Sequence, residues 1–461
     1  MASLSKDHKT LLDMLEGGIR TRLPANRVAE DFYTGEYIVR TLNIAVPPEL
    51  SGKLQVASDW PATVVNSYAE RMHFLGWGDR GRFGMADVAE VSGARLSVKQ
   101  AVLDSMIFGV GFIAVEPDDS GAWVAQSVPP SEGTIVWDSL NRRPVAGLRK
   151  RTLIGGESQV VMYLPEGILY LGPNSDKVDK FVPHSLGQPS IVRVRNSIRS
   201  NKWYGRSMIS RPVRYYTVAA CRTLEGMELN REFYTYPQRW LKNGTMDMFT
   251  ASDNPSEAEK MKAGFDAITG SLITLPPPEE GEPELELHQF SASPPTPFID
   301  QVRAYSQLMS SATGIPAAYL GFSTENPPSA DAIRAWLDRL TLGCRNQQDL
   351  LGDDLRRLGW ILSSLNNGLV PWREYAALVK ERWEDPASPT LSSDADAIMK
   401  LSPVIDPLSD WALDRLRIPD DQRKRMREAS AAKKLADLVE RSRKTPAEDW
   451  EVAAELSSRK E

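Results

Sequence analysis

The stretch SVKQAVLDSMIFGVGFIAVEP, residues 97–117, changes abruptly from one periodicity to another. Its first half places apolar or small residues at helical spacing: Val98, Ala101, Val102, Ser105, Met106 and Phe108. Gly109 and Gly111 interrupt that stripe, and FIAVE, residues 112–116, has the apolar character of a buried strand. The GVG is too short for a dinucleotide-binding loop, and it follows a helix rather than opening one. The stretch therefore predicts a helix that stops at a glycine and packs closely on a sheet.

From about residue 112 to 198 the pattern is that of a β-rich region. Its short runs alternate or are apolar: WVAQSV, GTIVWD, PVAGLRKRTLI, QVVMYLP, GILYLG and SIVRVRN. Segments of turn-forming residues separate them, such as DSGA, GGES and PNSD. Strands of this kind, placed after helices, predict an antiparallel β-rich region and an α+β fold.

Helices are predicted before this region. Residues 3–45 alternate apolar and polar positions at helical spacing, and Pro24 and Asn26 divide them into two helices, with Asn26 as an N-cap. Asp59 is expected to cap a further helix that begins at Trp60–Pro61, because proline is tolerated in a first turn. That helix is expected to end near HFLGW, residues 73–77.

Two long helices are predicted after the β-rich region. The first runs from Ser207 to about Tyr234, with Pro212 near its start, where a proline does least harm. Its apolar stripe consists of Val213, Tyr216, Ala220, Leu224, Met227 and Phe233. PQRWLKNG, residues 237–244, is expected to leave this helix as a strand. The second helix contains residues 299–313 and ends at Gly314.

The segment between these helices, residues 271–298, is proline-rich and acidic. Proline excludes a helix there and suits an exposed edge or a projecting ribbon. A bare linker is the alternative, but LELHQF, residues 285–290, alternates as a paired strand would.

The stretch GIPAAYLGFSTENPPSADAIRAWLDRL, residues 314–340, is apolar, then polar and proline-broken, then helical. We call residues 314–330 the seam. Ser329 is the expected N-cap of a helix that starts at Ala330 and is either one very long helix or two, broken near Gly343 or Gly352. From Pro371 the chain is predicted to be helical and rich in charge. DDQRKR, residues 420–425, favours a solvated helix face.

Composition places the chain among folded proteins of several domains, with 461 residues, 41% hydrophobic and 25% charged. No apolar run has the length of a membrane helix, and the start of the chain lacks the apolar core of a signal peptide, which predicts synthesis in the cytoplasm. Cys221 and Cys344 are predicted to be reduced and packed. The net charge of −6 argues against tight binding of nucleic acid through its phosphates.

Catalytic motifs are not found. The histidines do not occur at metal-ligand spacing: His8, His73, His184 and His288. No phosphate-binding loop, nucleophile elbow or Ser/His/Asp set is present. Adjacent acids could bind magnesium, but such pairs are common at turns and helix starts: Asp118–Asp119, Asp353–Asp354 and Asp420–Asp421. The sequence therefore predicts no catalytic residue, no metal, no cofactor and no enzyme activity.

The order of the segments resembles that of the portal proteins of tailed double-stranded DNA bacteriophages, in the SPP1-like portal family. The resemblance covers most of the chain and is carried by FYTGEY, ERMHFLGW, AVLDSMIFGVGFIAVEPD, PPSEGTIVWDSLNRRPVAGLR, RSMISRPVRYYTVAACRTLEGMELNREFYTYPQRWLKNG and ATGIPAAYLGF. Residues 97–150 and 203–244 carry most of its weight. Residues beyond about 400 carry almost none.

The resemblance implies an α+β, ring-forming subunit with an α+β wing, long stem helices, a small β-containing clip and a helical C-terminal crown. The implied parts are a wing (1–205), a first stem helix (206–234), a clip (235–296), a second stem helix (297–313), a tunnel loop (314–330), a long helix returning to the wing (331–400) and a helical crown and tail (401–461).

The same resemblance implies three sets of functional residues. The tunnel loop, which would face DNA, contributes Phe322, Ser323, Thr324, Glu325, Asn326, Pro327, Pro328, Ser329 and Asp331. The clip would dock partner proteins through Pro276, Pro277, Glu279, Glu280, Leu285 and Leu287. The stem set is Arg214, Arg222, Glu225 and Arg231. Arg334 and Arg339 follow the loop and would brake DNA if they faced a channel.

Partners follow from the resemblance as well. The subunit would form a homo-oligomeric ring, usually of twelve copies, at one capsid vertex of the virion, after synthesis in the host cytoplasm. Double-stranded DNA would pass through it without sequence specificity, and terminase, a head-completion adaptor, the major capsid protein and scaffolding protein would contact it, with no membrane involved. Two alternatives stay open: another capsid or tail oligomer, and, less favoured, a metal-dependent hydrolase of nucleic acids or phosphate esters.

Overall fold

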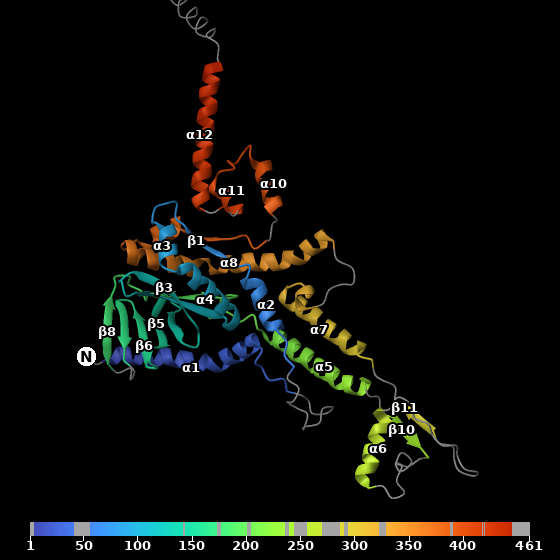
Figure 1. Ribbon diagram of the computed structural model, residues 1–461. Coiled ribbons are helices and arrows are strands. Elements are labelled where there is room, and N and C mark those ends of the chain that lie inside the picture. Colours follow the sequence, from blue (N-terminus) through green and yellow to red (C-terminus); the bar gives the residue numbers. More distant parts are fainter. Residues whose placement is uncertain are drawn as a thin grey trace, which may run out of the picture. The chain divides into compact units, whose positions relative to one another are not determined.

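The computed structural model describes residues 4–40, 56–141, 143–172, 177–200, 204–235, 239–243, 256–269, 286–289, 294–321, 329–387, 391–416, 418 and 420–444. The chain divides into two compact units, Met1–Pro386 and Ala387–Glu461. Helices and strands are mixed in the first unit, as the sequence predicted, whereas the second is helical (Figure 1). Among the described helices, none is long and apolar enough to cross a bilayer.

The helix-to-strand junction at residues 94–117 has the predicted form. Helix α4 (Ala94–Phe108) ends at Gly109, which has the left-handed φ of 95°, and strand β2 (Val110–Pro117) follows at once. A Cβ atom on Gly111 would overlap the carbonyl oxygen of Ala101 on α4. Glycine is therefore required where strand and helix make their closest approach.

Two antiparallel sheets make up the β-rich region. The three-stranded sheet has the order β3-β2-β9, with β3 at Trp123–Val128 and β9 at Ile191–Arg195. The five-stranded sheet has the order β4-β5-β6-β7-β8. Its strands are β4 (Gly133–Asp138), β5 (Arg143–Thr152), β6 (Ser158–Leu164), β7 (Gly167–Leu171) and β8 (Val178–Pro183). The runs chosen from the sequence are confirmed as strands, but β8 was missed because its mostly exposed residues carry no apolar alternation.

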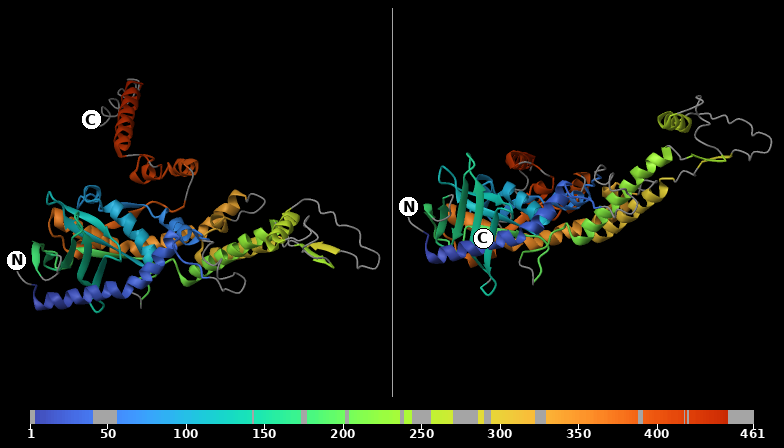
Figure 2. Two further views of the ribbon diagram at one scale, coloured as in Figure 1. Left: turned by 60° about the horizontal axis from the view of Figure 1, so that its bottom comes forward. Right: turned by 90° about the horizontal axis from the view of Figure 1, so that it is seen from below.

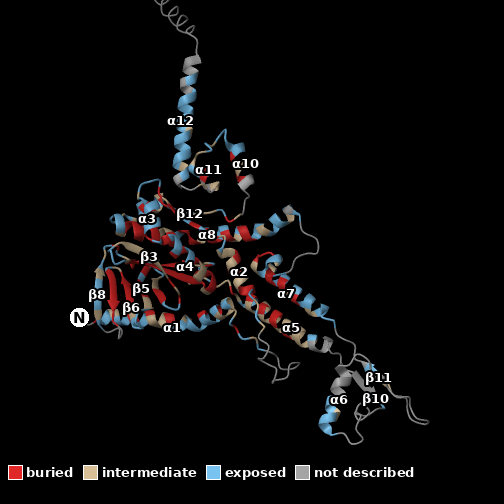
Figure 3. Cartoon of the chain, in the orientation of Figure 1, coloured by how far each residue is buried: buried red, intermediate tan, exposed pale blue. Residues whose placement is uncertain are grey.

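The first unit is layered. Helix α1 (Lys6–Thr34) covers one face of the five-stranded sheet, where Leu12 and Leu15 join Leu148 and Met162 in a buried cluster. The opposite face packs on the three-stranded sheet through Phe112, Tyr163 and their neighbours. Helix α4 lies against the far side of the three-stranded sheet (Figures 1 and 2). Figure 3 shows the buried residues concentrated in these layers.

The prediction of two helices divided at Pro24 and Asn26 is wrong, because α1 is continuous through Pro24. Asn26 is no N-cap: its side chain is buried, and its Nδ2 donates to the carbonyl oxygen of Pro130 at 3.4 Å. Ile19 before the proline and Ala29 after it are both buried. Packing on both sides of the proline therefore holds the two halves in line and outweighs the hydrogen bond that the proline removes.

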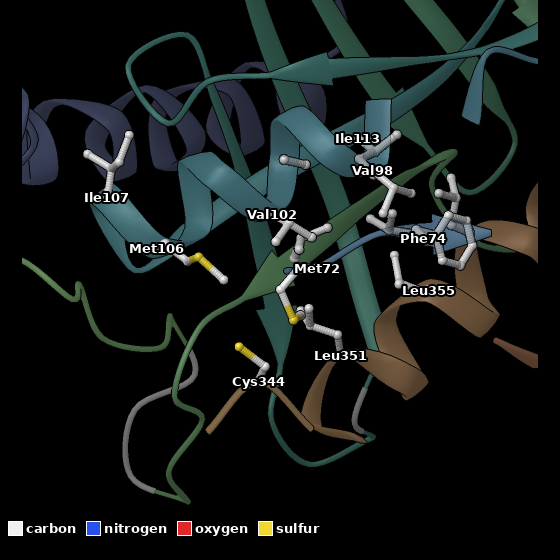
Figure 4. Packing of buried hydrophobic residues seen from close by; sticks show 14 of the residues in the cluster. Met72, Phe74, Val98, Val102, Met106, Ile107, Ile113, Cys344, Leu351 and Leu355 are labelled. Carbon is white, nitrogen blue, oxygen red and sulfur yellow. The ribbon is translucent and has the colours of Figure 1, made fainter. Parts of the chain in front are cut away.

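A large core lies beyond α4. It is formed with α2 (Trp60–Ala69), α3 (Met85–Val91), the single 38-residue helix α8 (Ala330–Asn367), α9 (Trp372–Leu378) and the antiparallel pair β1 (Phe74–Gly78) and β12 (Lys380–Trp383). Figure 4 shows Met72, Met106, Cys344 and Leu351 meeting in this core. Helix α8 is continuous through Gly343 and Gly352. Because these glycines have no Cβ atom, the side chains of Tyr68 and Glu381 can pack closely against the helix there. Helix α2 begins at Trp60 as predicted, but Asp59 makes no side-chain cap, and HFLGW forms most of strand β1.

The second unit contains α10 (Leu391–Leu401), α11 (Asp410–Arg415) and α12 (Asp420–Lys444). These helices confirm the helical prediction for most of the chain beyond Pro371. Strand β12 (Lys380–Trp383), which lies within the same predicted segment, contradicts it there. The described apolar core of this unit is small and consists of Ile398, Ala412 and Leu413. Ion pairs add to it, Arg415 with Asp394 at 3.3 Å and Arg427 with Asp410 at 2.5 Å.

Asp104 on α4 yields a pH-dependent prediction. Burial, with the charge of Glu30 on α1 as a second cause, raises its pKa to about 6. Since the pKa is raised in the folded chain, this carboxyl favours folding at pH values below its unfolded pKa and loses that contribution as the pH rises through 6. Asp104→Asn is therefore expected to stabilise the chain at pH 7 by about 1–3 kcal/mol and to have little effect near pH 4.

Urea unfolding of the purified chain at the two pH values measures this difference. Asp13→Asn, at an exposed position of α1, is the matched control and should change neither midpoint. A stabilisation by Asp104→Asn that is equal at both pH values would contradict the assignment of the raised pKa.

Candidate functional site

Two helices of the first unit, α5 (Arg211–Thr235) and α7 (Thr296–Thr313), lie side by side in both views of Figure 2. Both were predicted, and Pro212 stands in the first turn of α5 as expected. Helix α7 buries Val302, Ser306 and Met309. A Cβ on Gly226 of α5 would lie 3.2 Å from the ring of Phe298 on α7. A small residue at position 226 therefore lets the two helices approach closely.

The structure places the predicted stem residues on different sides of α5. Arg222 donates from Nε to the carbonyl oxygen of Arg40 at 2.9 Å, and Arg214 is half-buried. Glu225 is only 4% exposed, and burial raises its pKa although the charge of Arg222 lowers it. Arg231 is exposed and pairs with Glu228 at 3.0 Å. Of the four predicted residues, only Arg231 is therefore open to solvent in the single chain.

The uncovered face of α7 is polar. Arg303 pairs with Asp300 at 3.3 Å, and Gln301 donates to the hydroxyl of Tyr305 at 3.1 Å. Gln307 and Ser311 are exposed further along the helix. The charges on this face are thus paired, and it presents mainly amide and hydroxyl groups, although Leu308 is also 48% exposed.

Strands β10 (Arg239–Lys242) and β11 (Glu286–Gln289) form an antiparallel pair between α5 and α7 in the chain. Both were predicted. Lys242 pairs with Glu286 at 2.9 Å, and hydrogen bonds from His288 and Lys242 lower the pKa of Glu286. Leu287 stands opposite Leu241 in the register. The other predicted clip residues lie outside the described residues: Pro276, Pro277, Glu279, Glu280 and Leu285.

Helix α6 (Glu257–Thr269), also between β10 and β11 in the chain, was missed. It begins with a capping box, in which Ser256 and Glu259 bond reciprocally: the backbone N–H of Ser256 donates to Glu259 Oε2 at 2.8 Å, and that of Glu259 donates to Ser256 Oγ at 3.3 Å. The sequence SEAE carries this signal, so the helix start could have been found from the sequence.

The seam is anchored where α7 ends. Gly314 adopts a left-handed φ of 80°, and Tyr68 on α2 donates from its hydroxyl to the carbonyl oxygen of Thr313 at 2.9 Å. Ile315 and Leu320 are buried, and the indole N–H of Trp60 donates to the carbonyl oxygen of Leu320 at 3.2 Å. The apolar lead of the seam is therefore fixed to α2.

The seam ends at a helix cap. Ser329 Oγ accepts the backbone N–H of Ala332 at 3.2 Å, which confirms the predicted N-cap. Asp331 is exposed and pairs with Arg334 at 3.3 Å, while the Arg339 side chain lies against Gly314. The tunnel-loop residues Phe322, Ser323, Thr324, Glu325, Asn326, Pro327 and Pro328 lie outside the described residues. The start of α8 therefore lies next to the end of α7, and Asp331 neutralises part of the charge of Arg334.

Exposed apolar side chains on the first turns of α8 were not foreseen. Ile333 and Trp336 are each 44% exposed there. The sequence predicted a helix from Ala330 but not that these two apolar side chains would stay uncovered.

The cysteines fit the sequence analysis. Cys221 and Cys344 are free and buried, and burial raises the pKa of Cys344 to about 11. Cys221 Sγ lies 3.2 Å from the hydroxyl of Tyr37. Within the described ranges, no group of three or more His, Cys, Asp or Glu side chains is placed to hold a metal ion.

Comparison with known proteins shows which proteins this chain is similar to. No family model matches it. Two curated relatives, from Mycobacterium phage L5 and Mycobacterium phage D29, are each 26% identical to it over 393 residues, which is 80% of this chain and 77% of the relative. Both relatives are named portal protein. The chain is therefore similar to bacteriophage proteins. Its similarity to two proteins named portal protein confirms the predicted resemblance.

Solved structures with related shapes come from gene transfer agent particles. The neck of an empty particle, computed with C6 symmetry, has a TM-score of 0.43 and 14% identity over 78% of this chain and 90% of that chain. The neck of a native particle, computed with C12 symmetry, has a TM-score of 0.37 and 13% identity over 70% of this chain and 80% of that chain.

Proposed function

We propose that this chain is the portal subunit of a tailed bacteriophage, and that copies of it form a ring at one capsid vertex. DNA enters the capsid through the ring during packaging and leaves through it during ejection. The observation that carries this proposal is the 26% identity, over 80% of the chain, to two proteins named portal protein. The ring contains twelve copies, resides in the virion and has no catalytic activity of its own.

The parts of the subunit follow the order implied by the sequence. The layered region before α5 is the wing, α5 and α7 are the stem helices, and the segment between them is the clip. The close pairing of α5 and α7 supports the stem assignment. Two helices that are separated by a long connecting segment need a tight contact if they are to form one rigid pair. The seam is the tunnel loop, α8 returns to the wing, and the C-terminal helices form the crown.

DNA passage is proposed to depend on weak contact. The exposed face of α7 offers paired charges and neutral polar groups, and each chain carries a net charge of −6. Arg334 is paired with Asp331 at the end of the seam, so it adds little unbalanced positive charge there. Since phosphates bind proteins by displacing counterions with cations, a surface of this kind lets a duplex slide without holding it.

The clip is the proposed docking surface for the terminase and later for the head-completion adaptor. The paired strands β10 and β11 give this region a fixed element on which the adjoining acidic and proline-rich segment can be presented. ATP hydrolysis during packaging belongs to the terminase. The wing and crown contact the major capsid and scaffolding proteins.

The native mass of the purified chain tests the ring. Twelve copies of the 51.3 kDa chain weigh about 616 kDa, and end-on averages of such particles should show a central opening. A ring of thirteen copies would support the same architecture, because the capsid is absent from the preparation. A chain that stays monomeric even when produced together with its capsid and scaffolding proteins would contradict the proposal.

A further inference from the structure

A pocket of about 390 Å³ opens on the first unit between α1 and β4, an edge strand of the five-stranded sheet. Met14 and Leu15 of α1 and Val136 of β4 give it an apolar wall, and Tyr204 lines it as well. Its volume suits a small ligand or a large side chain of another protein. The proposed function gives this α1–β4 pocket no role.

Arg22 is the only charged side chain among the described residues that line the pocket. Its guanidinium carbon lies 3.7 Å from the centre of the Tyr204 ring, so the cation is held on an aromatic face. Burial lowers the pKa of Arg22, and in the described part of the chain its Nε has no hydrogen-bond partner and no acid pairs with it. A cation that is partly removed from water without a counter-charge is unfavourable in the folded chain. An anion that reached Arg22 would remove that penalty.

The surroundings of Arg22 are fixed by contacts within the chain. Glu16, less than two turns earlier on α1, is engaged with Lys150 of β5 at 2.8 Å and so does not neutralise Arg22. The hydroxyls of Thr134 on β4 and Tyr204 are hydrogen-bonded at 2.7 Å, which holds the ring that supports the guanidinium. The pocket is therefore formed before any partner arrives, and binding does not have to order it.

Two adjacent glycines of α1 line the pocket and differ in what surrounds them. A Cβ atom on Gly18 would lie 3.3 Å from Oγ1 of Thr134, so the approach of β4 explains the small residue there. A Cβ atom on Gly17 would meet nothing within 4 Å. Glycine is among the least favourable residues inside a helix, and packing within the chain gives no reason for it at position 17. The space beside Gly17 is therefore available to a group from outside the chain.

The residue types of the pocket point to a carboxylate that is carried beside an apolar group. The planar guanidinium of Arg22 matches a carboxylate through two parallel hydrogen bonds. The wall of Met14, Leu15 and Val136 suits an apolar neighbour of that carboxylate. An inorganic anion would satisfy the cation but would leave the wall uncovered.

A second copy of this chain is the partner that fits the pocket. Each chain has 61 acidic residues against 55 lysines and arginines, so a second copy offers carboxylates in excess to a site that needs one. A closed ring of identical subunits joins two different surfaces of each copy, one that receives and one that enters. A preformed pocket that contains a cation without a counter-charge has the properties of the receiving surface.

We propose that the α1–β4 pocket receives, from the neighbouring copy in the ring, an acidic side chain that stands beside an apolar one, and that Arg22 pairs with its carboxylate. This inference rests on the proposed ring and deepens it, because it assigns a receiving surface for the contact between copies. It also gives ring closure an ionic component, which salt weakens.

Two variants remove the site by different means and spare the fold. Arg22→Met keeps an apolar stem against Tyr204 and removes the charge, while Gly17→Leu fills the open space with a better helix former. Each should raise the subunit concentration at which half of the chains are in rings by about tenfold, measured by sedimentation of a dilution series. Arg22→Met should also make that concentration less dependent on salt between about 50 and 500 mM, whereas Gly17→Leu should keep the dependence. Neither should lower the urea midpoint of the unassembled chain.

The matched controls lie on α1 outside the pocket. Arg20→Met makes the same charge change at an exposed arginine, and Ala25→Leu adds a leucine at an exposed position; both should leave the half-assembly concentration within about twofold. Equal weakening by the controls would overturn the proposal, since any change on α1 would then act alike.

Wild-type rings together with unaltered assembly of Arg22→Met and Gly17→Leu would also overturn the proposal, because the pocket would then not lie between copies, while the portal assignment would stand. A wild-type chain that forms no ring even with its capsid and scaffolding proteins would contradict the portal assignment and this inference together.

Discussion

A chain in which residues 322–328, FSTENPP, are replaced by a Gly-Ser segment of equal length is expected to form normal rings and to leave the particles empty of DNA. The ends of the seam explain why assembly should survive. Tyr68 and Trp60 fix the chain at Thr313 and Leu320, and Ser329 caps α8, all outside the replaced residues. A deletion that reached Ser329 would remove the cap as well and would confuse a folding defect with a functional one.

Loss of DNA is expected because the replaced residues are the proposed tunnel loop. A Gly-Ser segment keeps the chain closed but removes the acid, the amide and the restraint of Pro327 and Pro328. The fraction of DNA-filled particles, measured by sedimentation and nuclease-protected DNA, should fall to background while the native mass of the ring is unchanged. A ring that fails to assemble would mean that the segment is a contact between subunits.

A matched replacement in the exposed turn between β5 and β6 tests whether the expected loss of DNA is specific to the proposed tunnel loop. Residues 154–157, IGGE, form an exposed turn there, and a Gly-Ser segment in their place should leave both assembly and packaging unchanged. Equal loss of DNA from this control would remove the special role of the seam.

The sequence predicted the fold best where local and tertiary preferences agree. The α4–β2 junction could be found because its glycines are needed both to end a helix and to let the strand approach it. The strands with buried faces were found from apolar alternation. Strand β8 and the pair β1–β12 were missed, because an exposed edge and a pairing between residues 74 and 383 leave no local pattern. Pro24 shows the reverse case, in which packing overrides a strong local signal.

The candidate site could be predicted only in outline. The helix ends at Gly314 and Ser329 were predicted and are confirmed, because helix capping depends on residues that are close in sequence. The partner of Arg222 on α5 is the carbonyl oxygen of Arg40, which is remote in sequence and leaves no local pattern. DDQRKR, residues 420–425, was predicted to lie on a solvated helix face, and Lys424 and Arg425 of that segment are exposed.

Glu116→Ala is expected to cause the largest loss of folding stability of any single change considered, about 3–5 kcal/mol. Glu116 is 2% exposed between the two sheets, and its carboxylate accepts four hydrogen bonds. The donors are Tyr163 Oη at 2.6 Å, Tyr170 Oη at 3.3 Å, Arg149 at 3.1 Å and Arg151 at 3.2 Å. Burial and the neighbouring carboxylate raise the pKa of Tyr163, so its hydroxyl stays protonated and donates. Removing the acceptor would leave the largely buried Arg149 guanidinium and the two buried tyrosine hydroxyls without it.

Urea unfolding of Glu116→Ala and of a control, Glu90→Ala, measures this loss. Glu90 pairs with Arg95 at 2.9 Å on the surface, and losing that pair should cost less than about 1 kcal/mol. The double variant Glu116→Met/Arg149→Met should recover much of the lost stability, because it removes the most buried cation together with its partner, whereas Arg151 is more exposed and can reach water. If Glu116→Ala were no more damaging than Glu90→Ala, the network would not be what joins the two sheets, and apolar packing between Phe112, Ile168 and Ile191 would have to hold them alone.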